Sequence, residues 1–199
     1  MKKLLIVTIL FFFALNIGAQ TQQGKIFVSA DSKIAGTIGS TSLKYDGTTV
    51  GSSTTSLQFN LSPSVGYFLI DNFVVGLTID LTTQSLKAGS EKQTSTTYAV
   101  GPMGRFYIGT SNVKPFVGAS FLLGSQSSTY TPSTGSAISS GASGIIVMAG
   151  GGIAFYVNDH VAIEGQISYM GESLKNKDDS KEVEKANQIY LAVGFSLSF

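Results

Sequence analysis

The sequence predicts an all-β fold, an eight-stranded antiparallel up-and-down β-barrel that crosses a membrane with its strands. Three observations predict it. Within segments of about ten residues, apolar and polar residues alternate at every second position. This period of two is typical of a strand with two different faces. Long and short connections alternate along the chain. Finally, only 13 Lys and Arg and 12 Asp and Glu occur among 199 residues, about half the usual charged share of a soluble domain.

The N-terminal segment has the pattern of an export signal. Two lysines near the start precede an apolar run over Leu4–Leu15, and small residues follow as far as Ala19. This order of a basic, an apolar and a small-residue region predicts a secretory signal peptide over 1–19. A retained membrane anchor is the alternative, but the run is short for a helical span. Cleavage leaves one predicted barrel domain, 20–199.

Eight segments alternate strongly enough to be predicted as strands. They lie at 25–33, 57–68, 73–83, 98–108, 115–124, 145–156, 161–170 and 188–199. In the second of them, Leu57, Phe59 and Leu61 share one face, and the other face is polar. No stretch shows a convincing helical period. One face is bulky and apolar in most of these segments, and the other is mainly Gly, Ser, Thr, Gln and Asn.

The connections indicate how the strands are joined. Short turns rich in Asn, Asp and Gly are predicted at 69–72, 109–113 and 157–160, and such residues favour tight turns. Long polar stretches lie at 35–54, 84–96, 125–144 and 171–186. In an even-stranded meander this alternation places all long connections on one rim and both chain ends on the other, as in outer-membrane barrels.

The polar face distinguishes a membrane barrel from a soluble, lipocalin-like one. Water-facing strand positions of soluble β-proteins usually carry Lys and Glu. Here only Asp80, Arg105 and Glu164 are charged in the second to eighth predicted strands. A narrow lumen makes an unpaired charge costly, so we expect Arg105 to contact Glu164, with Asp80 joining directly or through water. We interpret this lumen ionic network as structural; a gate or a proton-sensitive plug is the alternative.

Aromatic residues gather at the predicted strand ends. Beside the short turns, we expect an interface aromatic belt that consists of Tyr67, Phe106, Tyr107, Phe155 and Tyr156. Further tyrosines lie next to the long connections, at Tyr98, Tyr169 and Tyr190. Strands favour aromatic residues in any case. Their placement at strand ends nevertheless indicates the two interfaces of a bilayer.

The last segment, IYLAVGFSLSF, alternates and ends on Phe199. With Phe195, this terminal aromatic looks like the signal that the barrel-assembly machinery recognises. Blocks such as LSPSVGYFLIDNFVVGLTIDL and GGGIAFYVNDHVAIEGQISYMG share a strand, aromatic, short-turn, strand plan. Over Gly24–Phe199 the chain resembles the small porin-like outer-membrane β-barrel family, of the OmpA transmembrane-domain and OmpX type. The resemblance implies a monomer in the outer membrane of a Gram-negative bacterium, in contact with lipid and lipopolysaccharide.

Few residues of the chain are suited to catalysis or to binding a metal ion. The chain has no Cys, one His and a formal charge of +1, which argues against thiol chemistry, a His-rich metal centre and an electrostatic nucleic-acid binder. His160 lies in a predicted short turn, on the rim opposite the outer leaflet. The glycines at 150–152 indicate a bend or close packing, not a phosphate loop. We therefore expect no catalytic residues, cofactor or metal.

These observations favour a structural or surface-interaction role, with the long connections exposed to the exterior. Two alternatives from other classes stay open at this point. One is a narrow channel for small solutes or ions, and the other is a lipid-modifying enzyme of the outer membrane.

Overall fold

A computed structural model describes residues 21–33, 40–45, 48–177 and 183–199 of the chain. The predicted signal peptide lies outside these residues. The described part forms nine strands, β1 (Ile26–Lys33), β2 (Ser40–Tyr45), β3 (Thr48–Ile70), β4 (Phe73–Ala88), β5 (Glu91–Tyr107), β6 (Val113–Thr131), β7 (Ile138–Tyr156), β8 (Val161–Asn176) and β9 (Val183–Ser198). Among the described residues, no helix is long and apolar enough to cross a membrane.

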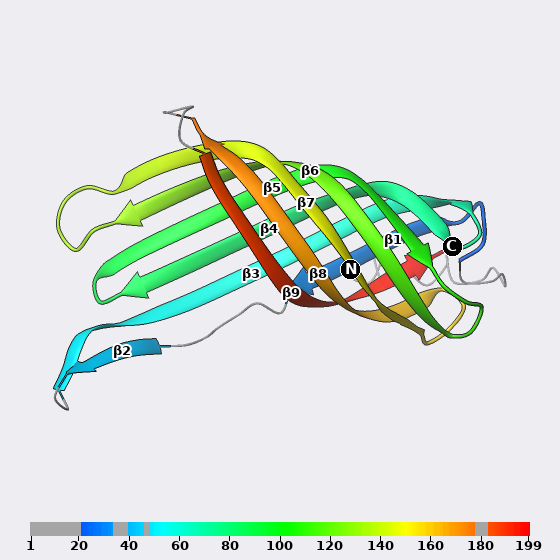
Figure 1. The fold of residues 1–199 in the computed structure, drawn as a ribbon, viewed down its shortest axis with the longest axis horizontal. Coiled ribbons are helices and arrows are strands. Elements are labelled where there is room, and N and C mark those ends of the chain that lie inside the picture. Colours follow the sequence, from blue (N-terminus) through cyan, green and yellow to red (C-terminus); the bar gives the residue numbers. More distant parts are fainter. Residues whose placement is uncertain (1–20, 34–39, 46–47, 178–182) are drawn as a thin grey trace, which may run out of the picture.

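Eight of the nine strands close into a barrel. Consecutive strands from β3 to β9 pair antiparallel, and β1 closes the ring because it pairs with both β3 and β9. The short strand β2 pairs with the outer part of β3 and extends away from the ring (Figure 1). The predicted fold class, an eight-stranded up-and-down transmembrane barrel, is confirmed. Short turns, such as Asp71 and Asn72, join the strands at one rim, and long hairpins project from the other (Figure 1).

The two faces of the strands separate as the alternation predicts. On β3 the side chain of Phe59 is 64% exposed on the outside, whereas that of its neighbour Asn60 is 2% exposed inside the barrel. Successive side chains of a strand point to opposite faces, so one apolar set meets lipid and one polar set fills the lumen. Large apolar side chains are exposed in this way on all the strands from β3 to β9.

The strands are longer than predicted at the long-hairpin rim. The polar stretch 84–96 contains only a two-residue turn, Gly89 and Ser90, and the stretch 125–144 contains the ends of β6 and β7. Beyond the bilayer both faces of a hairpin meet water, so the apolar alternation ends although the backbone pairing continues. Ser95 and Ser128 hydrogen-bond across this region at 2.8 Å. We call these projecting ends of β4–β7 the hairpin arms.

The predicted aromatic belt requires a correction. Tyr67, Phe106 and Phe155 point outward, but Tyr107 and Tyr156 are buried in the lumen. Phe106 and Tyr107 are adjacent on β5, and Phe155 and Tyr156 are adjacent on β7. Because neighbours on a strand face opposite sides, only one residue of each pair can reach lipid.

Candidate functional site: the barrel lumen

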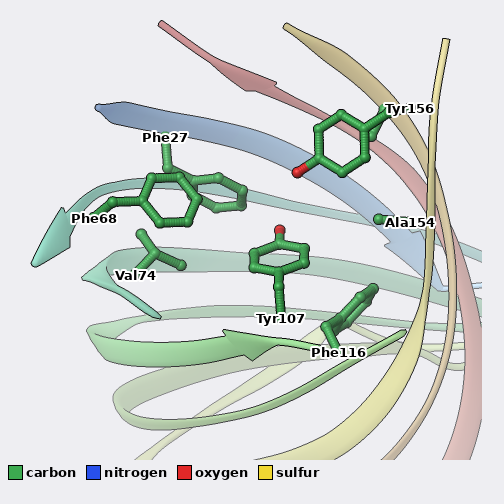
Figure 2. Close-up of a cluster of buried hydrophobic side chains, with 8 residues drawn as sticks. Phe27, Phe68, Val74, Tyr107, Phe116, Ala154 and Tyr156 are labelled. Atoms are coloured by element: carbon green, nitrogen blue, oxygen red, sulfur yellow. The ribbon is translucent and has the colours of Figure 1, made fainter. Parts of the chain in front are cut away.

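The lumen near the short-turn rim is filled by a cluster of apolar and aromatic side chains that we call the aromatic plug. Its members come from seven barrel strands, and they are Phe27, Phe68, Val74, Tyr107, Phe116, Ala154, Tyr156 and Ala162. Figure 2 shows their rings reaching toward one another from different sides of the barrel. Phe68, Val74 and Tyr107 have no exposed surface. An eight-stranded barrel is just wide enough for its interior side chains to fill it.

The rings of the plug form a continuous chain of contacts. Phe27 meets Phe68 edge to face with ring centroids 6.1 Å apart, and Phe68 lies 6.1 Å from Tyr107. Tyr107 in turn lies 5.6 Å from Phe116. These separations fall in the favourable range for aromatic pairs. The plug therefore spans the lumen from β1 to β6 as one packed layer.

A buried ionic group lies directly against the plug. Arg105 on β5 donates to Glu164 on β8 at 2.5 Å, and it lies 3.5 Å from Asp31 on β1. The other carboxylate oxygen of Glu164 accepts hydrogen bonds from Ser196 at 2.6 Å and from the Tyr107 hydroxyl at 3.2 Å. We call these residues the Arg105 group. It links four barrel strands and, through Tyr107, joins the aromatic plug.

The guanidinium of Arg105 is also flanked by aromatic rings. It lies 4.4 Å from the ring centre of Phe116 and 5.4 Å from that of Phe27. A planar guanidinium is weakly hydrated and stacks on rings, so it suits a site from which water is excluded. Removing a partner from such a buried ion pair leaves a charge that nothing compensates.

A second ionic group lies nearer the long-hairpin rim. Lys33 on β1 pairs with Asp80 on β4 at 2.9 Å. Asp80 also accepts hydrogen bonds from Ser62 at 2.7 Å and from Thr82 at 3.0 Å. Lys33 lies 5.0 Å from the ring centre of Tyr190. We call this set the Lys33 group.

The expected ionic network thus has a different membership. The structure brings Arg105 and Glu164 together but places Asp80 in the separate Lys33 group. Sequence reasoning missed Asp31 and Lys33, the two charges of the first strand. A signal was present, because Phe27, Ser29, Asp31 and Lys33 alternate along β1 and so share one face.

Cavities lie on both sides of the Lys33 group. One of about 80 Å³ lies between the ionic groups and is lined by Asp31, Lys33 and Arg105. The Oδ1 atom of Asp31 is buried without a hydrogen-bond partner among the described residues. A larger cavity of about 240 Å³ lies on the long-hairpin side of the Lys33 group. We call it the mouth cavity.

The short-turn rim is closed by the residues that precede β1. Thr21 is buried and donates a hydrogen bond to the side chain of Asn72, at 2.5 Å. The ammonium of Lys114 donates to the Thr21 hydroxyl at 2.7 Å and lies 5.6 Å from the ring centre of Tyr156. The chain entering the barrel is therefore fastened beneath the plug.

His160 and the C-terminal aromatic residues lie at this same rim. The Nδ1 atom of His160 is 2.8 Å from the backbone oxygen of Ser198. Phe195 is exposed on the outer face, and the backbone of Phe199 pairs with that of Ile26. Within the described ranges, no three His, Cys, Asp or Glu side chains are grouped so that they could hold a metal ion. The role of Phe195 and Phe199 as an assembly signal stays a prediction.

Comparison with solved structures finds outer-membrane proteins of similar architecture. A major outer-membrane protein of Thermus thermophilus aligns with 10% identity, covering 88% of this chain and 99% of its own, with a TM-score of 0.56. The outer-membrane protein OprG of Pseudomonas aeruginosa aligns with 16% identity, 92% and 99% coverage, and a TM-score of 0.52. The attachment invasion locus protein Ail of Yersinia pestis aligns with 14% identity, covering 89% of this chain and 100% of its own, with a TM-score of 0.52.

The chain has the fold of a small outer-membrane β-barrel. At these identities the likeness concerns the fold alone. No family model matches the sequence, and no curated protein matches it.

Proposed function

We propose that this protein is an integral outer-membrane barrel with a structural or surface-interaction role, and that its lumen does not conduct solutes. The aromatic plug carries this proposal, because rings from opposite sides of the lumen meet in one layer. The Arg105 group lies against that layer and bridges several strands. An eight-stranded barrel leaves no wide channel beside such side chains. The hairpin arms, which are rich in Ser and Thr, supply the surface exposed to the exterior.

We further propose that the barrel has no enzymatic activity. His160 supports this, because its ring contacts a backbone carbonyl at the short-turn rim. A general base acts only within hydrogen-bond reach of a substrate. Lipids of the outer leaflet would meet the opposite rim, where the hairpin arms project.

Deletion of the protein from its bacterium tests the proposed role. We expect the deletion strain to become more sensitive to detergent, or to lose binding to a surface partner. Complementation should use the full chain and a variant in which a short turn replaces residues 129–139 of the β6–β7 arm, which leaves Gln126 of the mouth cavity in place. Rescue of detergent resistance by both chains identifies a structural role, and rescue of partner binding by the full chain alone identifies surface interaction. A deletion strain with an unchanged envelope and unchanged surface binding would contradict the proposal.

A further inference from the structure

The mouth cavity differs from the rest of the lumen in its chemistry. Fourteen residues line it, and only Ile146, Met170 and Ala186 among them are apolar. Lys33 and Asp80 form its floor, and they already neutralise each other at 2.9 Å. The walls are mainly amides and hydroxyls, and Glu172 is the one further charged group among the lining residues, so the cavity carries a single net negative charge.

Four glutamines line this space, and the amide of Gln188 on β9 already contacts the sulfur of Met170 at 3.8 Å. The other three come from three different strands. Gln58 lies on β3, Gln84 on β4 and Gln126 on β6, and all three line the cavity. No hydrogen bond joins any of their side-chain amides to another residue of the part of the chain that the structure describes. All three are only partly buried. Their amides are therefore available to a molecule in the cavity.

The kind of ligand follows from these groups. Each amide has two donor hydrogens and one acceptor oxygen, and a hydroxyl likewise donates and accepts. A molecule with several hydroxyls matches such walls. An anion would meet the carboxylates of Asp80 and Glu172, whereas a cation would find Asp80 already paired with Lys33 and Glu172 already engaged by another group. The cavity of about 240 Å³ has room for several water molecules. This volume fits one small molecule, and the side chains of Met170 and Ile146 offer it a limited apolar surface.

We propose that the mouth cavity binds a small neutral polyhydroxylated molecule, of the size of a monosaccharide, through the amides of Gln58, Gln84 and Gln126. This inference goes beyond the proposed function, because it requires neither a conducting lumen nor a partner on the hairpin arms. A conductance result that overturned the closed lumen would leave this binding test unchanged.

The test is a nuclear magnetic resonance titration of the full ¹⁵N-labelled chain. The protein should be folded in an amine-oxide detergent, because sugar-headed detergents would compete for the site. Glucose, galactose and N-acetylglucosamine are the neutral probes, with glucuronate and glucosamine as charged counterparts. We expect at least one neutral sugar to shift the side-chain amide signals of Gln84 and Gln126 saturably, and both charged sugars to bind more weakly.

Matched variants on one strand make the titration specific. Gln84→Leu removes one amide from the cavity, and we expect roughly tenfold weaker binding, which corresponds to about 1.4 kcal/mol and lies within the range for a lost hydrogen bond. Thr83→Leu changes the adjacent residue on the exposed face and should leave binding unchanged. Unboiled gel mobility checks that each variant is folded. If Gln84→Leu does not fold, Gln126→Leu takes its place, with Ser127→Leu as its control.

Three results would overturn the proposal. They are the absence of a saturable shift with all three neutral sugars, binding of a charged sugar as tight as that of the neutral ones, and equal loss of binding in the cavity-facing and outward-facing variants.

Discussion

The short-turn half and the long-hairpin half of the lumen are built from the same strands but are filled with different side chains. The first holds the aromatic plug and the Arg105 group, whose members are almost entirely buried. The second holds the Lys33 group beneath the mouth cavity, with amide and hydroxyl walls. Closure of the lumen is therefore concentrated at one end of the barrel, and we expect stability to be concentrated there too. The other end is left open for water or a ligand.

Loss of a plug ring should have the largest effect on stability. We expect Phe68→Ala to lower the free energy of unfolding by about 4 kcal/mol, because it removes buried apolar surface and leaves a cavity. Phe59→Ala on the same strand faces lipid, which fills the vacated space, so only the transfer contribution is lost. Urea titrations monitored by gel mobility measure both. Equal losses would show that the plug contributes no more than the lipid face.

Disruption of the two ionic groups should have the next largest effect on the free energy of unfolding, and the effect should differ between the two halves of the lumen. We expect Glu164→Gln to cost about 3 kcal/mol, since it weakens the compensation of a buried guanidinium that cannot lose its proton. The side chain of Lys33 is only 4% exposed. Asp80→Asn should nevertheless cost less, because the ammonium of Lys33, unlike a guanidinium, can lose its proton when its partner is removed. The same urea titrations measure the two losses. A larger loss of unfolding free energy for Asp80→Asn would show that the long-hairpin half, and not the short-turn half, is the more stabilising one.

A smaller effect is expected from glycines at close strand contacts. A Cβ atom at Gly150 on β7 would collide with the Ser168 hydroxyl and the Ile167 carbonyl on β8, whereas a Cβ atom at Gly165 would meet nothing within 4 Å. We expect Gly150→Ala to cost about 2 kcal/mol through forced strand movement, and Gly165→Ala to change stability little. Thermal midpoints of the unboiled gel band provide the comparison. Similar midpoints for both variants would contradict it.

The smallest difference concerns two serine hydroxyls. Ser196 donates to the buried carboxylate of Glu164 at 2.6 Å, while Ser128 bonds Ser95 on a hairpin arm at 2.8 Å. Hydrogen bonds to buried charges are stronger, so Ser196→Ala should cost about 1.5 kcal/mol and Ser128→Ala about 0.5 kcal/mol. Urea unfolding midpoints with a common slope resolve this difference. A larger loss of unfolding free energy for Ser128→Ala than for Ser196→Ala would show that the hairpin arms contribute more to stability than the Arg105 group.

The strands and their faces could be predicted because lipid and lumen impose opposite demands on neighbouring residues. This contrast is visible in Phe59 and Asn60, and applying it strictly would also have placed Tyr107 and Tyr156 inside. The hairpin arms were not predicted as strands because both of their faces meet water. The membership of the ionic groups depends on register around the closed barrel. Ring closure brings Lys33 on β1 within 2.9 Å of Asp80 on β4, with only β3 between the two strands. The alternation of one strand cannot encode that pairing.

The central claim is that the aromatic plug and the Arg105 group close this outer-membrane barrel. Planar-bilayer recording on the purified, refolded full chain tests it most directly, with refolding verified by gel mobility before and after boiling. We predict a membrane current that stays at baseline, without reproducible steps, at salt concentrations where open barrels conduct. Stable steps of uniform size that scale with salt concentration would contradict it and establish a continuous channel through the lumen.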